Sequence, residues 1–220
     1  MTMAERTVLS FDELNRLYEE EHTLRSMPFE QFFGEMDLSQ EQKDAREDTA
    51  KKIEKFIRDA LIAMYYMTQD GIFDYGEAEE AISKPYNGLL KELAIPLTAF
   101  FTMSHVISVT TEIISATLNH PDDPYYFSTD RARLIAENEA NSIFNDAQFQ
   151  DAILTGKTRK GWKAILDSRT RQTHIEANGQ EVPIDLPFEV GDSLLMFPRD
   201  MSLGASPDEI VNCRCTSYYF

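Results

Sequence analysis

Cysteine is scarce in this chain of 220 residues, with Cys213 and Cys215 as its two thiols. So few cysteines exclude the disulfide framework that supports many small secreted proteins. The first residues, Met1–Arg6, also lack the basic start and apolar run of a signal peptide. We therefore expect a protein that is made in a reducing cytoplasm and acts there or in a particle assembled there.

Long apolar runs are absent as well, although one stretch comes close to being one. Leu93–Thr111 carries no charged side chain, and its length would suffice to cross a bilayer. It also contains Pro96, His105 and several Ser and Thr residues, which make its mean hydropathy too low for a membrane helix. We predict a helix buried on most of its sides, with His105 hydrogen-bonded in the core, and no contact with a membrane.

Basic residues are outnumbered, with 21 Lys and Arg against 38 Asp and Glu, which gives a formal net charge of −17. The local exception is residues 157–171, where basic side chains prevail. Because affinity for duplex DNA depends on neutralised phosphates, an acidic protein confines any weak DNA contact to such a strip. The predicted DNA-contact strip consists of Lys157, Arg159, Lys160 and Lys163. An ordinary solvated surface is the alternative interpretation.

Helix signals fill the first part of the chain. Ser10–Glu13 and Ser39–Gln42 have the pattern of capping boxes, in which the side chain of each end residue caps the backbone of the other. The second box begins the longest predicted helix, which ends near Gln69. The aromatic segment Phe29–Phe33 lies between the two helices, and it either packs in the core or docks a partner protein.

The helical pattern continues less regularly and then gives way to strand-like segments. Pro85 and Gly88 interrupt residues 73–95, which predicts short broken helices there. A further helix is predicted from Asp130 to Leu154, capped by Ser128 or Thr129. Beyond it, the pattern predicts a short helix ending near residue 177 and strands over 162–166, 182–184, 194–197 and 210–219.

These elements predict an α+β fold class. A predominantly α-helical N-terminal part precedes a small C-terminal α+β domain with a short antiparallel sheet. The turn Asn119–Pro124, with its two prolines, separates the two parts. We therefore predict a helical region for assembly and partner binding over 1–122 and a second domain over 123–220.

Several short motifs follow one another in the last third of the chain. In order, they are Gly156–Trp162, Asp167–His174, Asn178–Gln180, Pro183–Asp185 and Asn212–Cys215. Together, over about residues 125–220, they resemble the C-terminal domain of the phage head morphogenesis family named after the F protein of phage Mu, the minor capsid proteins. The resemblance implies a non-enzymatic protein of the virion interior. It would enter the procapsid in few copies through the portal, scaffold or major capsid protein, and contact packaged DNA.

The resemblance also gives a role to a polar row on the predicted helix. Arg133, Glu137 and Asn141 are spaced i, i+4 and i+8, and they look like the family's network packed against the Asp167–His174 segment. In that arrangement Glu137 accepts hydrogen bonds from Arg169 or Arg171. An ordinary salt-bridged face exposed to solvent is the alternative.

The two cysteines have alternative roles. Placed two positions apart on a strand, Cys213 and Cys215 point to one face, where thiolates can hold zinc with two further ligands. Relatives carry a CxxC motif where this chain has residues 171–174, so by resemblance only His174 can still bind there, with Asp167 as the fourth candidate ligand. We expect no cofactor: His174 and Asp167 would then hydrogen-bond to arginines, and the thiols would pack as small apolar groups. Zinc is the alternative.

The same four residues, Asp167, His174, Cys213 and Cys215, also permit a catalytic interpretation. A cysteine beside a histidine can act as a nucleophile, and nearby Arg214 would lower its pKa. Domains of the family occur within larger polymorphic toxin proteins. A toxin-like or metal- or thiol-dependent enzyme, a nuclease or hydrolase, is therefore the alternative function. The sequence contains no recognisable oxyanion hole, P-loop or HExxH motif to support it.

Overall fold

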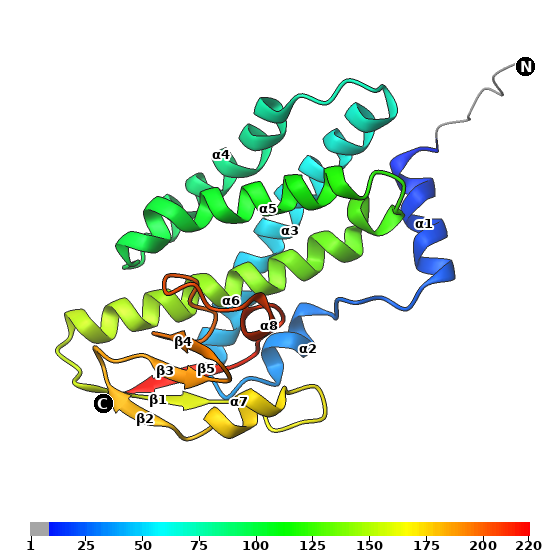
Figure 1. Cartoon of the computed structure of the whole chain (residues 1–220). Coiled ribbons are helices and arrows are strands. Elements are labelled where there is room, and N and C mark those ends of the chain that lie inside the picture. Colours follow the sequence, from blue (N-terminus) through cyan, green and yellow to red (C-terminus); the bar gives the residue numbers. More distant parts are fainter. Residues whose placement is uncertain (1–8) are drawn as a thin grey trace, which may run out of the picture.

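The computed structural model describes residues 9–220. It consists of a bundle of helices with a small sheet-containing part packed beside helix α6 (Figure 1). This arrangement confirms the predicted α+β class. No helix among residues 9–220 has the length and apolar character needed to span a membrane. The expectation about Met1–Arg6 lies outside the described residues.

The elements follow one another along the chain in two groups. The bundle consists of α1 (Phe11–Glu21), α2 (Phe29–Gly34), α3 (Gln40–Gln69), α4 (Tyr75–Leu93), the π-helix η1 (Phe101–His105), α5 (Val106–Asn119), the 3₁₀ helix η2 (Pro124–Phe127) and α6 (Thr129–Leu154). The C-terminal part consists of β1 (Arg159–Lys163), α7 (Gln172–Ala177), β2 (Glu181–Pro183), β3 (Phe188–Val190), β4 (Ser193–Leu195), α8 (Pro207–Ile210) and β5 (Thr216–Tyr219).

Polar caps explain where the major helices begin. Ser10 with Glu13, and Ser39 with Gln42, form the two predicted capping boxes at the starts of α1 and α3. Ser128 caps α6, since its side chain accepts a hydrogen bond from the third backbone N–H of the helix. These three starts were predictable because a cap depends on residues that are neighbours in the sequence.

The prediction of broken helices over residues 73–95 is wrong, because α4 continues through Pro85 and Gly88. Pro85 lies on the exposed side, where water can bond the carbonyl group that lost its donor. Apolar side chains at helical spacing cover the other side, and they are Ala78, Ile82, Tyr86 and Leu89. Burial of this stripe outweighs the helix-breaking tendency of the proline and glycine.

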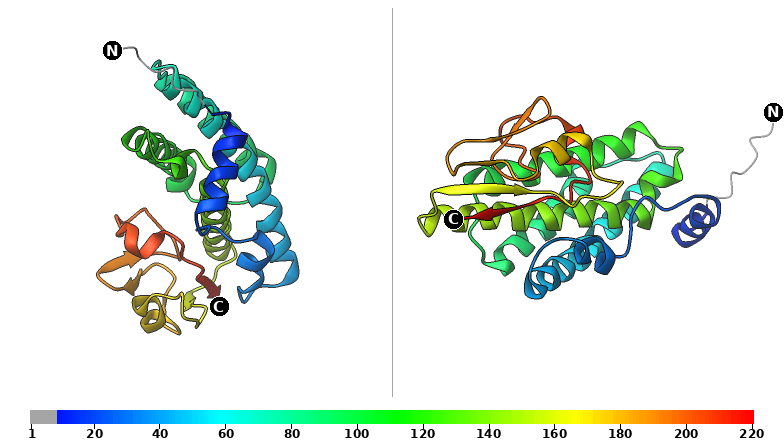
Figure 2. Two further views of the ribbon diagram at one scale, coloured as in Figure 1. Left: turned by 90° about the vertical axis from the view of Figure 1, so that its right-hand side faces the viewer. Right: turned by 90° about the horizontal axis from the view of Figure 1, so that it is seen from below.

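The uncharged stretch contains η1 and the first residues of α5, and it is less buried than predicted. One side packs on the core, whereas Met103 and Ile107 on the other side are 72% and 63% exposed. The reason is that α5 lies at the outside of the bundle, so neighbouring helices cover it on one side only (Figure 2). The prediction for His105 is confirmed: its ring is buried, and Nε2 lies 2.7 Å from a carboxylate oxygen of Glu139.

Helices α3 and α6 form the most extensive helix pair of the bundle. The main core combines apolar side chains of α2, α3, α4, α5 and α6. Residues on both sides of the predicted boundary at 122/123 therefore share one core. Phe29, Phe32 and Phe33 are buried in that core, which confirms the packing interpretation of this segment and leaves it unavailable for docking.

The C-terminal sheet has the strand order β2-β1-β5, with both pairs antiparallel, and β3 and β4 form a separate hairpin. Gly161 of β1 lies opposite Tyr218 of β5, whose ring occupies the space that a Cβ at position 161 would need. A second, smaller core gathers on this sheet around the fully buried Trp162.

The first and last predicted strands differ most from those observed, and β3 was not predicted. The first strand covers residues 159–163 instead of 162–166, because pairing with both β2 and β5 sets its position. The last strand is limited to β5, because α8 and a turn occupy the residues before it. In that turn the backbone N–H of Cys213 bonds the carbonyl oxygen of Ile210. Cys213 and Cys215 therefore lie in the loop between α8 and β5 and not on a strand.

Candidate functional site

A buried cluster of His174, Cys213 and Cys215 lies in the C-terminal part. His174 comes from α7 and the two cysteines come from the loop before β5. The Nδ1 atom of His174 is 3.3 Å from Sγ of Cys215 and 3.6 Å from Sγ of Cys213. All three side chains are almost completely buried. The structure thus brings together three of the four residues that the sequence analysis proposed as metal ligands.

The orientation of His174 depends on Glu209, a residue that the sequence analysis missed. The Nε2 atom of His174 is 2.9 Å from Oε2 of Glu209, and the hydroxyl group of Thr173 donates to the same oxygen at 2.8 Å. Trp162 packs edge-on against the imidazole ring. Glu209 belongs to α8, far from His174 in sequence, and no local motif indicates the contact.

The cluster distributes protons unequally between its two thiols. Burial alone would raise the pKa of the Cys213 thiol, but hydrogen bonds with Cys215 and His174 hold it well below its usual value. The hydrogen bond with Cys213 and burial both raise the pKa of Cys215. Burial lowers the pKa of His174, whereas its hydrogen bond with the Cys213 thiolate raises it more, so the net shift is upward. Without a metal, Cys213 is therefore the thiol that ionises.

Asp167 does not join the cluster. Its Oδ1 atom is 2.6 Å from Nη2 of Arg214, and its other oxygen faces Arg169. The hydrogen bond from Arg214 is the main reason why the pKa of Asp167 lies far below its usual value. Asp167 is therefore not placed as a fourth ligand of the cluster. Its two arginine partners match the alternative in which Asp167 hydrogen-bonds to arginines.

Helix α6 supports the cysteine loop from behind. The side-chain amide of Asn141 donates to the carbonyl oxygen of Cys213 at 3.1 Å, and that of Asn145 donates to the carbonyl oxygen of Cys215 at 3.2 Å. Arg46 of α3 in turn donates to the side-chain oxygens of both asparagines. This fully buried arginine therefore links the N-terminal helices to the loop of the cluster.

The polar row of α6 contributes only its last member to this site. Asn141 reaches the cysteine loop, whereas Arg133 pairs with Glu54 of α3 at 3.3 Å, and Glu137 accepts the backbone N–H of Met27 at 2.9 Å. The prediction that Glu137 binds Arg169 or Arg171 is wrong, since those two donate to Glu35 and to the carbonyl oxygen of Val211. A helix has 3.6 residues per turn, so a spacing of i, i+4 and i+8 rotates by about 80° around it. Each member of the row consequently faces a different neighbour.

The buried environment of Glu137 can be tested through the pH dependence of stability. Burial raises the pKa of Glu137 from 4.5 to about 8, so the native protein holds a proton that the unfolded chain loses. This contribution to stability is complete below about pH 4.5 and is lost as the pH rises through 8. Between these limits, the unfolding free energy of the parent protein should fall with pH more steeply than that of Glu137→Gln, by up to about 1.4 kcal/mol per pH unit. Urea titrations of both proteins at pH 5, 6, 7 and about 8 measure the difference, and equal slopes would contradict it.

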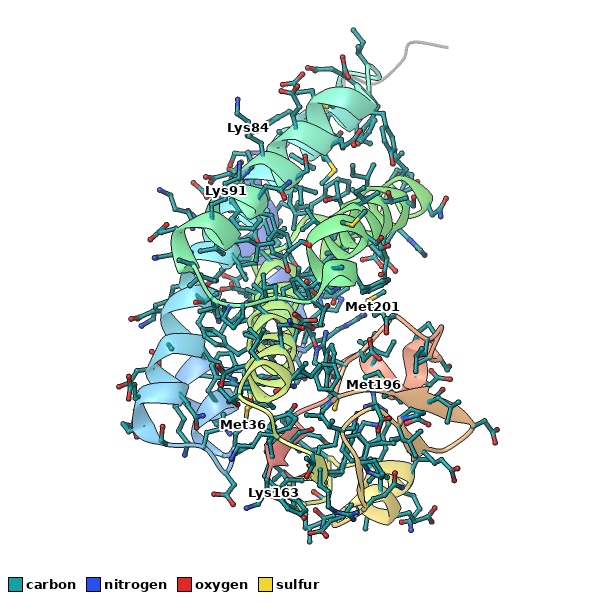
Figure 3. All side chains as sticks on the ribbon, turned by 90° about the vertical axis from the view of Figure 1, so that its left-hand side faces the viewer. Met36, Lys84, Lys91, Lys163, Met196 and Met201 are labelled. Carbon is teal, nitrogen blue, oxygen red and sulfur yellow. The ribbon has the colours of Figure 1, made fainter. Side chains whose placement is uncertain are left out.

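Most of the basic strip is engaged within the molecule. Lys160 is fully buried, and its Nζ donates to the carbonyl oxygen of Met196 at 2.7 Å. Lys163, at the edge of the C-terminal part in Figure 3, pairs with Asp37. Arg159 faces Glu181 at 4.0 Å. Lys160 is thus unavailable for the predicted DNA contact. Lys163 instead helps to hold the C-terminal part against the loop between α2 and α3.

A groove of about 500 Å³ separates α5 and α6 from the loop over residues 199–211. Its lining is mainly apolar, and Met201 lies where the helices meet the C-terminal part (Figure 3). Glu139 and Arg199 lie at its wall, both buried. Glu139 accepts the hydroxyl group of Tyr86 at 2.6 Å in addition to its contact with His105. These buried polar groups stabilise the junction between the two parts.

The comparison with known families decides the relationship that the motifs indicated. The sequence profile of the family described as "Phage Mu protein F like protein" matches residues 74–218, about two thirds of the chain. The chain belongs to the phage Mu F-like family. This family is associated with phage head morphogenesis and structural proteins of the head. The match includes the cluster, its supporting helix α6 and the helices α4 and α5.

A second comparison found a relative that is named for an enzymatic activity. The NAD(+)–arginine ADP-ribosyltransferase EFV of Enterococcus faecalis (strain ATCC 700802 / V583) is 34% identical over 91 residues, which are 40% of this chain and 18% of that protein. The chain therefore spans less than a fifth of the length of this curated relative. No solved structure matches this Mu F-like chain.

Proposed function

We propose that this Mu F-like protein is a minor capsid protein that enters the procapsid through contact between its helical part and the portal. Membership of the head morphogenesis family is the observation that carries the proposal. A protein with a net charge of −17 is repelled by DNA, so recruitment depends on contacts with other head proteins. The internal pairing of the basic strip supports this conclusion, because it leaves few cations to contact phosphates.

The outer face of η1 and α5 is the surface that fits such a contact best. It presents Met103, Ile107 and Leu118, all at least 40% exposed, together with small hydroxyl side chains and no charged group between Met103 and Thr111. Interface cores are depleted of charge and enriched in methionine, and this face has both properties. The aromatic segment of α2 is buried and the exposed side of α3 is charged, so neither offers an alternative apolar surface.

Two glutamates placed on this face should prevent incorporation. In the full-length chain, the double variant Met103→Glu, Ile107→Glu is expected to enter procapsids at least about 10-fold less than the parent protein, because burying a charge at an interface is costly. Gln69→Glu with Asn87→Glu adds the same charge at exposed positions on α3 and α4 and serves as the matched control.

Co-sedimentation with procapsids produced in cells that lack the native protein measures this incorporation. Equal incorporation of the two double variants would refute the assigned surface. If incorporation depends on α5 but still occurs in particles that lack the portal, the partner would be the scaffold or the major capsid protein instead of the portal. Failure of even the parent protein to co-sediment with procapsids would refute the proposed function itself.

A toxin-like or thiol-dependent enzyme is the second candidate function, and the match to part of an ADP-ribosyltransferase favours keeping it. The shared segment is a small fraction of that enzyme, and this chain's thiol cluster is enclosed in the C-terminal part. Purified protein incubated with NAD⁺ and an arginine-containing acceptor tests the idea. Turnover that disappears in Cys213→Ser would support an enzyme, whereas a parent protein that enters procapsids and shows no turnover would support the structural role.

A further inference from the structure

We infer that Nδ1 of His174 and the sulfur atoms of Cys213 and Cys215 bind one zinc ion. The head-assembly role neither requires nor supplies this site, and the two can fail independently. These three ligand atoms all lie within 4.8 Å of one another, and all three residues are buried.

The spacing fits tetrahedral coordination. Zinc lies about 2.3 Å from sulfur and about 2.05 Å from nitrogen, so tetrahedral ligands place nitrogen and sulfur about 3.6 Å apart. The two nitrogen–sulfur distances here are 3.3 and 3.6 Å. A single N–H group can donate a good hydrogen bond to only one thiolate, but both sulfur atoms lie beside the same nitrogen atom of His174. An ion between the three atoms satisfies all of them at once.

The imidazole is oriented as a metal ligand. Nε2 of His174 is bonded to the carboxylate of Glu209 at 2.9 Å, so in the neutral ring this nitrogen carries the proton and Nδ1 presents its lone pair to the sulfurs. Histidine ligands of zinc usually donate their second nitrogen to a carboxylate in this way. Because Glu209 lies on the opposite side of the ring, it positions His174 and does not ligate the same ion.

The surroundings of the sulfurs suit thiolates. The backbone N–H of Cys215 points at Sγ of Cys213 at 3.4 Å. The indole N–H of Trp162 is completely buried and has no hydrogen-bond partner among residues 9–220. Trp162 belongs to the same small core as both cysteines. A buried donor of this kind is costly without an acceptor, and a metal-bound thiolate supplies one.

The ligand types and the free space define the ion and its fourth ligand. Two thiolates and one imidazole favour zinc over calcium or magnesium, which prefer oxygen. Beside the cluster is a recess of about 10 Å³ lined in part by Arg169, Arg171 and Asn212. That volume holds about one water molecule, which completes the tetrahedron. The ion would join α7 to the cysteine loop, which α6 already holds through Asn141.

Metal analysis of the full-length, reduced and untagged protein tests the inference. The parent protein should carry close to one equivalent of zinc, and a strong chelator should lower its melting temperature. Titration of chelated protein with Co²⁺ should produce a sulfur-to-cobalt charge-transfer band and the visible bands of tetrahedral cobalt. A zinc content under about a tenth of an equivalent together with a Co²⁺ titration that lacks these bands would overturn the site.

Variants separate this ligand set from the alternatives. Cys213→Ser and His174→Asn should each abolish stoichiometric zinc, and Glu209→Gln should weaken zinc binding by about 10–100-fold while retaining it. Asp167→Asn should bind zinc as the parent protein does, because that carboxylate pairs with arginines. If the cysteine variant fails to fold, the Co²⁺ spectra of the parent and of Glu209→Gln still show whether these residues bind the metal. Unchanged affinity in Glu209→Gln, or loss of zinc in folded Asp167→Asn, would contradict the assigned coordination.

Discussion

Replacing Glu139 with alanine is expected to lower the free energy of unfolding by about 3–5 kcal/mol, which is typical of removing one member of a buried ionic group. Burial alone would raise the pKa of Glu139, but the charges of His105 and Arg199 and two hydrogen bonds hold it below its usual value. The residue is therefore ionised in the core. Its removal leaves the guanidinium of Arg199, the ring of His105 and the hydroxyl group of Tyr86 buried without their carboxylate.

Urea denaturation at neutral pH measures this effect, and Glu92→Ala is the matched control. Glu92 forms an exposed ion pair with Lys52 at 2.7 Å, and surface pairs of this kind contribute about 0–1 kcal/mol. Similar losses in the two variants would mean that the polar group at the junction of the two parts contributes nothing beyond a surface pair.

Replacing Asn141 with leucine should have the second largest effect, a loss of about 2–5 kcal/mol. The side chain is completely buried, donates to the carbonyl oxygen of Cys213 and accepts from Nε of Arg46. Leucine has a similar volume but satisfies neither partner, and each buried polar group left unpaired costs about 1–3 kcal/mol. Because the cysteine loop loses its support, the variant should also bind zinc more weakly than the parent protein.

The control for this prediction is Asn87→Leu, which changes an exposed asparagine whose amide bonds a carbonyl of its own helix, α4. Its effect should stay within about 0.5 kcal/mol, as for most surface substitutions. An Asn141→Leu protein as stable as the control would show that the contacts from α3 through α6 to the loop do not stabilise the fold.

Local chemistry along the chain was sufficient to predict the helix starts and the family. Ser10, Ser39 and Ser128 cap helices through groups three residues away, so sequence neighbours contain all the information. The order and spacing of the motifs between Gly156 and Cys215 likewise indicated the Mu F-like family, and the family match confirms it. His105 was recognisable as a core residue because it lies in an uncharged helix.

Tertiary packing alone decided the rest. Burial of one side of α4 keeps the helix intact at Pro85, and no residue near that proline in the sequence indicates that the helix continues. Asp167 is close to His174 in the sequence, yet it pairs with Arg214, which is distant in the chain. Glu209, which is also distant in the chain, positions His174. Capping bonds form between sequence neighbours, whereas ion pairs and buried hydrogen bonds depend on which distant segments the core brings together. The sequence therefore determined the helix starts and the family, and the packing of α6 against the cysteine loop determined the site.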